Sequence, residues 1–113
     1  MTCEIWQVVV VPFPFTDRAT TKRRPALVLS VKAFNRHGHC VLAMITSASH
    51  RPWPGDTSIG DLKTAGLNAP SLVRLKLFTL DNRFIVRCIG SLGSPDRASV
   101  ATQLRTFVPG SPD

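Results

Sequence analysis

The stretch between residues 5 and 31 most constrains the fold of this chain. Two apolar runs, residues 5–11 and 25–31, are short and rich in β-branched side chains, so each predicts a buried strand. Pro12 cannot donate a hydrogen bond to a sheet, and we expect it to end the first strand. A basic tripeptide, residues 22–24, closes the connecting loop. The sequence therefore predicts two core strands that present a basic loop at one fixed place on the surface.

Three further apolar runs predict strands, at residues 39–46, 71–80 and 84–92. The polar segment 47–60 is rich in Pro, Gly and Ser and predicts a surface loop. Residues 61–65 predict one helical turn, which Gly66 ends.

The last part of the chain predicts a helix. Ser94 can cap it, Pro95 suits its first turn, and Asp96 complements the helix dipole. Apolar residues then recur at helical spacing, namely Val100, Ala101, Leu104, Phe107 and Val108. Several strands followed by one helix predict a mainly β fold with a C-terminal helix (α+β), in which a small, strongly curved antiparallel sheet or barrel carries the helix. We expect a single domain over residues 1–113, with residues 109–113 as a flexible tail.

The charge of the chain points to a polyanionic partner. A net charge of +7 is large for 113 residues. Such an excess attracts nucleic acid first, ahead of acidic proteins or anionic membrane. The alternative is that the positive charge serves solubility only.

The cysteines and histidines predict neither a disulfide framework nor a metal centre. Cys3, Cys40 and Cys88 are odd in number and contain no CxxC pair, which favours a reducing compartment. His37 and His39 precede Cys40 closely, but no second ligand pair completes a zinc site, so a polar turn is the preferred interpretation. We expect no cofactor. Neither a signal peptide nor a membrane-spanning segment is evident, so we expect a cytoplasmic protein.

Two groups of polar residues can carry chemistry. Lys22, Arg23 and Arg24 offer fixed positive charge, and the planar fork of an arginine matches a phosphate. Arg24 precedes Pro25, which favours an extended backbone at the mouth of a strand. Thr46 and Ser47 add two hydroxyls at the end of another strand, where they can bind a phosphate or a ribose. The alternatives are a solvated loop tip and an ordinary turn.

The order of motifs along nearly the whole chain closely resembles the MazF/PemK family of toxins from type II toxin–antitoxin systems. The resemblance rests on Val-Pro-Phe-Pro-Phe-Thr-Asp (11–17), Lys-Arg-Arg-Pro-Ala-Leu-Val-Leu-Ser (22–30) and Ala-Met-Ile-Thr-Ser (43–47). It continues through Ala-Gly-Leu (65–67), Pro-Ser-Leu-Val-Arg (70–74), Lys-Leu-Phe-Thr-Leu-Asp (76–81) and Ile-Gly-Ser-Leu (89–92).

This resemblance implies an SH3-like β-barrel with a C-terminal helix that works as a homodimer. It also implies a metal-independent endoribonuclease that cuts single-stranded RNA at short sequences, stops translation, and is neutralised by a cognate antitoxin. The family's catalytic pair, the arginine before the proline and the threonine that closes the third strand, falls on Arg24 and Thr46.

The implied reaction is attack of a ribose 2′-hydroxyl on the adjacent phosphate, which leaves a 2′,3′-cyclic phosphate and a 5′-hydroxyl. The extra negative charge in the transition state suits stabilisation by Arg24. Thr46 suits alignment of the phosphate or the 2′-hydroxyl, because nothing in the sequence activates it as a base. An arginine is a poor proton donor, so the sequence leaves the proton-transfer groups unassigned.

The chain departs from the family pattern at two places. Gln7 stands where many relatives carry an acidic residue, and residues 74–76 (Arg-Leu-Lys) replace a segment in which some carry a carboxylate. A carboxylate from elsewhere, Asp17 or Asp81, is the candidate substitute. The added cations favour stronger RNA binding, so we expect a competent nuclease of reduced speed.

Substrate recognition is expected from loops and exposed cations. Single-stranded RNA is bound by stacking on aromatic side chains and by charge, and Trp53 serves equally well at a protein interface. The expected RNA-binding residues are Phe15, Thr16, Lys22, Arg23, Ser47, Trp53, Arg74 and Lys76. Two alternatives remain open at this point: a non-catalytic RNA-binding barrel, and a gyrase inhibitor like the CcdB toxins. The gyrase-inhibitor alternative is disfavoured, because the CcdB toxins use an exposed C-terminal aromatic residue and this chain ends Pro-Gly-Ser-Pro-Asp.

Overall fold

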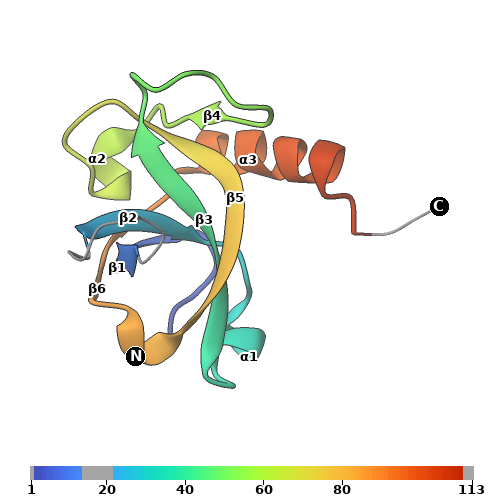
Figure 1. Ribbon diagram of the computed structural model, residues 1–113. Helices are drawn as coiled ribbons and strands as arrows, with labels where there is room; N and C mark the ends of the chain where they lie inside the picture. Colours follow the sequence, from blue (N-terminus) through green and yellow to red (C-terminus); the bar gives the residue numbers. More distant parts are fainter. Residues whose placement is uncertain (1, 14–21, 111–113) are drawn as a thin grey trace.

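The computed structural model of the chain describes residues 2–13 and 22–110 (Figure 1). Its strands are β1 (Gln7–Phe13), β2 (Lys22–Val28), β3 (His39–Ser47), β4 (Thr57–Ser58), β5 (Ser71–Asp81) and β6 (Arg87–Ser91). Its helices are α1 (Lys32–Asn35), α2 (Leu62–Ala65), the 3-10 turn η1 (Asn82–Phe84) and α3 (Ser94–Phe107). No helix within this described part of the chain is long and apolar enough to cross a membrane.

The strands form one curled sheet in the order β4-β5-β3-β2-β1-β6, and every pair is antiparallel. Figure 1 shows the sheet bent into a half-barrel, with α3 lying across one end beside β4 and β5. The expected mainly β fold with a C-terminal helix is confirmed.

The sheet buries apolar side chains on both faces, because successive residues of a strand point to opposite sides. In β1, Val9 and Val11 belong to one cluster, which also holds Ala26 and Leu42. Residues on the opposite face form the other cluster, which holds Val8, Leu27, Ala43, Ile45 and Val73. Helix α3 covers this second cluster with Val100 and Leu104, so the helix closes one side of the half-barrel.

The first two strands extend further into the connecting segment than the sequence indicates. β1 does not end at Pro12 but continues to Phe13, and Pro12 lies opposite Arg23 in β2. The expected stop was wrong because the pairing of β1 with β6 already ends at Val10, so no second neighbour requires an N–H from Pro12. The basic tripeptide is consequently the first part of β2, not the tip of a loop.

Several other boundaries differ from the expectation. β2 ends at Val28 and the short helix α1 follows, where a longer strand and a turn were expected. The polar loop contains the two-residue strand β4, which pairs with β5. β6 begins only at Arg87, because Asp81 accepts a hydrogen bond from the Arg83 N–H and holds η1.

Helix α3 also differs in detail from its sequence pattern. Gly93 occupies the cap position and Ser94 makes no capping hydrogen bond. Phe107 and Val108 are 53% and 48% exposed, so only the first half of the apolar stripe packs on the sheet. The buried carboxylate of Asp96 accepts hydrogen bonds from the N–H groups of Gly60 and Asp61 (2.9 and 3.0 Å), which ties α3 to the segment before α2. The tail residues 111–113 lie outside the described residues.

Helix α2 and strand β6 meet backbone to backbone at two glycines. Gly66 ends α2 with φ +77°, and a Cβ there would overlap the carbonyl of Ile89. A Cβ on Gly90 would lie 2.5 Å from the backbone of Thr64 and Ala65. Only glycine permits an approach this close, and the approach fixes where the segment after α2 runs.

The Gly90→Ala variant should therefore be less stable by roughly 3 kcal/mol, because neither backbone can move away without opening the sheet. Gly93→Ala is the matched control, since a Cβ there meets only ordinary contacts, 3.4 Å or more from Asp61. Urea unfolding of both variants checks this. Equal free energies of unfolding for the two variants would contradict the close approach.

Candidate functional site

Arg24 and Thr46 are brought together by the pairing of β2 with β3. The ladder joins Ala26 to Met44, and Arg24 and Thr46 come two residues further along each strand. Two residues is one full period of a strand, so both side chains lie on the same face as that last pair. The side chain of Thr46 is nearly buried, with the residue 6% exposed, whereas Arg24 is partly exposed. The fold thus brings the predicted pair to one face of the sheet, although the two residues are 22 positions apart in sequence.

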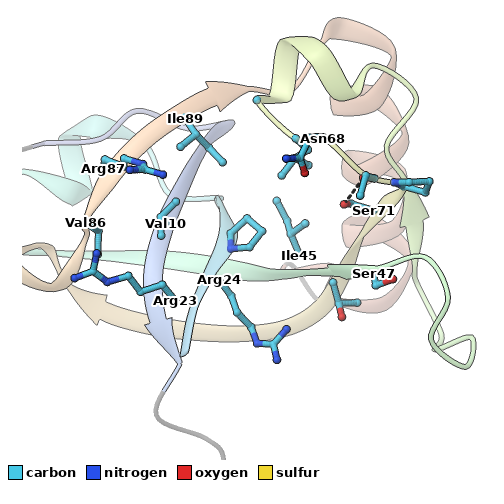
Figure 2. A pocket seen from close by; sticks show the side chains of 16 residues that line it. Val10, Arg23, Arg24, Ile45, Ser47, Asn68, Ser71, Val86, Arg87 and Ile89 are labelled. Atoms are coloured by element: carbon cyan, nitrogen blue, oxygen red, sulfur yellow. Dashed lines mark hydrogen bonds between the residues drawn. The ribbon is translucent and has the colours of Figure 1, made fainter. Parts of the chain in front are cut away.

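A first cleft of about 470 Å³ lies beside this pair (Figure 2). Its walls come from β1, β2, β3 and β6 and from the segment 66–70 that follows α2. Figure 2 shows Arg23 and Arg24 on the β2 side, with Ser47 and Ser71 at the ends of β3 and β5. The first cleft therefore combines guanidinium groups with hydroxyls, as a site for a phosphate requires.

Arg87 is a member of this site that the sequence did not indicate. It lies in β6 opposite Val10 of β1, and Val10 lies opposite Pro25 of β2. Arg87 thus reaches the first cleft from β6, which lies on the other side of β1 from β2 (Figure 2). The sequence could not place Arg87 at this site, because β6 is the last strand in sequence and yet pairs with the first.

A second cleft of about 450 Å³ lies on the other side of Arg24 and Thr46, which line both clefts. Its other lining residues are Phe13, Met44, His50, Lys76, Leu77 and Phe78. One wall is therefore apolar, and the polar wall consists of two cations, a hydroxyl and an imidazole. The catalytic pair expected from the sequence lies at the junction of the two clefts.

Ser47 has a structural task in addition to lining the first cleft. Its hydroxyl lies 2.8 Å from the Ser49 hydroxyl and accepts a hydrogen bond from the Ser49 N–H (3.3 Å). Its carbonyl accepts a hydrogen bond from the His50 N–H. Ser47 therefore both stabilises the turn after β3 and lines the first cleft.

Arg74 is buried and hydrogen-bonded to its neighbours. Its guanidinium donates two hydrogen bonds to Asp56 (3.1 and 3.0 Å) and one to the carbonyl of Arg51 (2.8 Å). Partial burial acts to raise the pKa of Asp56, but hydrogen bonds from Arg74 and the Trp53 N–H outweigh it, and the net pKa is lowered. Arg74 lines neither cleft, so its observed role is to hold the loop between β3 and β4 against β5.

Trp53 lies on top of this ion pair. The Lys76 ammonium lies 4.7 Å from the centre of its indole ring, and the Arg74 guanidinium lies 5.8 Å from it. Trp53 is 44% exposed and lines neither cleft, but Lys76 connects it to the second cleft. Three expected RNA-binding residues, Trp53, Arg74 and Lys76, therefore form one cluster.

The remaining expected residues divide between the site and elsewhere. Arg23 lines the first cleft, and Lys22 lies opposite Phe13 at the exposed start of β2. Phe15, Thr16 and Asp17 lie outside the described residues.

Asp81, the one of the two offered carboxylates that the structure describes, does not reach the site. Asp81 pairs with Arg83 (3.0 Å) and lies opposite His39, at the other end of β3 from Thr46. Gln7 uses its side-chain oxygen to accept the Glu4 N–H. Among the described residues, no three His, Cys, Asp or Glu side chains gather as a metal site would require.

The Asp56→Asn variant should lose about 3 kcal/mol of stability at neutral pH, because it leaves Arg74 buried without its counter-ion. The native pKa of Asp56 lies below its unfolded value, so its contribution is present above the unfolded pKa and disappears as pH falls through the native pKa. The difference between wild type and variant should therefore shrink in acid. Urea unfolding at neutral and acidic pH measures it, and Asp81→Asn, which removes an exposed pair, should change stability far less.

Comparison with known proteins agrees with these observations. A sequence model of the family described as PemK-like, MazF-like toxin of type II toxin–antitoxin system matches residues 4–108. No match was found among curated protein sequences.

Among solved structures, MazE–MazF (Form-II) from Deinococcus radiodurans is similar, with a TM-score of 0.78, 21% identity, and 98% of this chain and 99% of that one covered. A mycobacterial endoribonuclease in complex with its cognate antitoxin has a TM-score of 0.75 and 20% identity, with 98% of both chains covered. Mycobacterium tuberculosis toxin MazF-mt6 has a TM-score of 0.71 and 22% identity over 88% and 93% of the two chains. By its sequence and its fold, this chain belongs to the PemK-like, MazF-like family of toxins of type II toxin–antitoxin systems.

Proposed function

We propose that this toxin is a metal-independent endoribonuclease that cuts single-stranded RNA at short sequences, and that Arg24 and Thr46 are its catalytic pair. The observation that carries the proposal is the position of these two residues at the junction of two clefts. A phosphate held there would have one cleft on each side, of about 470 and 450 Å³. Family membership supports the same activity, because one similar structure is described as an endoribonuclease.

The reaction follows from the chemistry of the pair. The ribose 2′-oxygen attacks the adjacent phosphorus, and the bond from phosphorus to the 5′-oxygen breaks. Negative charge accumulates on the phosphoryl oxygens, and the Arg24 guanidinium stabilises it with two parallel hydrogen bonds. The Thr46 hydroxyl, held by a nearly buried strand position, aligns the phosphate for attack. The products are a 2′,3′-cyclic phosphate and a 5′-hydroxyl.

The charge of the two clefts suits an RNA strand. Arg23 and Arg87 line the first cleft and Lys76 the second, and none of them forms an ion pair with a described residue. Such cations remain available for successive phosphates along a single strand. Trp53, which is exposed beside Lys76, offers a surface for base stacking.

The same clefts support a proposal about partners. Two similar structures contain an antitoxin bound to the toxin. An antitoxin segment with acidic side chains would occupy the basic first cleft and exclude RNA by direct competition.

We further propose a homodimer in the cytoplasm, in keeping with the toxin family.

Replacement of Arg24 by Ala should lower the rate of RNA cleavage on the order of a hundredfold or more, because one preorganised donor to the transition state is lost. Arg105→Ala is the control, since Arg105 is an exposed arginine on α3 that lines neither cleft. The assay uses a mixed RNA pool in EDTA with analysis of the new RNA ends. Undiminished cleavage by Arg24→Ala would overturn the assignment.

Arg87→Ala should weaken RNA binding roughly tenfold, because a charge-assisted hydrogen bond to phosphate is lost. The slope of log affinity against log salt should fall by about 0.7, the value for one phosphate contact on a single strand. Arg105→Ala removes the same charge from an exposed position on α3 and should leave that slope unchanged. Identical slopes for the two variants would mean that only net charge matters.

A further inference from the structure

His50 lies next to the catalytic pair although the sequence did not single it out. It comes three residues after β3 and lines the second cleft with Arg24, Thr46 and Lys76. A tight turn determines its place: the His50 N–H donates to the Ser47 carbonyl (3.3 Å), and the hydroxyls of Ser47 and Ser49 bond to each other (2.8 Å). The imidazole is thus attached to the end of the strand that carries Thr46.

The reaction proposed above requires a proton for the departing 5′-oxygen. Arg24 retains its protons at any physiological pH, and a threonine hydroxyl is a weak acid. No Asp or Glu stands among the described residues that line the two clefts. His50 is the one histidine among the described residues that line the two clefts, and histidine is the side chain that most often serves as a general acid or base.

We propose that His50 is the proton donor to the 5′-oxygen of the leaving nucleotide. This inference rests on the proposed endoribonuclease function. In the step, the 2′-oxygen forms its bond to phosphorus while the bond between phosphorus and the 5′-oxygen breaks. The imidazolium N–H proton passes to that oxygen, which departs as a hydroxyl, and the imidazole is left neutral. The proton of the 2′-hydroxyl leaves to solvent, so charge and atoms balance.

The charges that face His50 favour donation over acceptance of a proton. Arg24 from β2 and Lys76 from β5 line the same cleft, and both are cations. Donation converts the imidazolium to a neutral ring and removes its repulsion with these groups. Acceptance of a proton would create that repulsion. The negative charge that develops on the 5′-oxygen is also stabilised by the Lys76 ammonium on the same side.

The test compares His50→Gln with wild type in single-turnover cleavage of an oligonucleotide that carries the preferred cut sequence, identified from a mixed RNA pool. We expect a rate lower by on the order of 10²–10⁴-fold, with unchanged affinity for a 2′-deoxy analogue that cannot be cut. The wild-type rate should decline on the alkaline side, and this decline should be absent in the variant. His39→Gln is the matched control, because His39 lies at the other end of β3, roughly 23 Å along the strand from Thr46.

A second substrate separates donation from other roles. When sulfur replaces the bridging 5′-oxygen at the cut site, the thiolate departs without a proton, so His50→Gln should regain nearly the wild-type rate. Equal loss on the oxygen and sulfur substrates, or no loss on either, would overturn the proton-donor role while the endoribonuclease function stands. Failure of the wild-type protein to cut any RNA would instead overturn the proposed function itself.

Discussion

The backbone contact between α2 and β6 determines how the rest of this fold can be arranged. Gly66 and Gly90 let two main chains approach more closely than any side chain permits. The contact turns the chain after α2 along the open side of the sheet, so that residues 66–70 become a wall of the first cleft. Without it, the segment after α2 would have no fixed relation to β6 and its Arg87, which the ladder with β1 places beside β2. A site for an extended anion therefore depends on two positions that lack side chains.

The site itself is a consequence of strand alternation at the edge of a curled sheet. Arg24 and Thr46 continue a face whose other residues are core, but they come after the ladder between β2 and β3 has ended. Both residues consequently line a cleft on each side, and the two clefts are of similar volume, although Thr46 itself is nearly buried. One guanidinium between two clefts suits the proposed in-line displacement at a phosphate, because the nucleophile enters on one side of phosphorus while the leaving group departs on the other.

The cations near the site differ in how available they are to bind an anion, although each adds the same charge to the composition. Arg74 has its hydrogen bonds taken by Asp56 and Arg51, and it anchors the loop that carries Trp53. Lys76, two residues along the same strand, stacks on Trp53 and faces the second cleft. Residues 74–76 contain no carboxylate, but Asp56 places one beside Arg74. That carboxylate belongs to an ion pair that supports the fold.

The residue pattern was sufficient to predict the mainly β fold, the C-terminal helix and the turn at Gly66, whereas the pairing of Arg24 with Thr46 was implied only by the family resemblance. These features depend on local periodicity, turn chemistry and the order of motifs. Strand ends were predicted less well: β1 passes through Pro12 because a neighbouring strand has already stopped, and no local signal records that. Arg87, His50 and the Arg74–Asp56 pair depended on tertiary structure alone, because strand order and loop path bring together residues that are far apart in sequence.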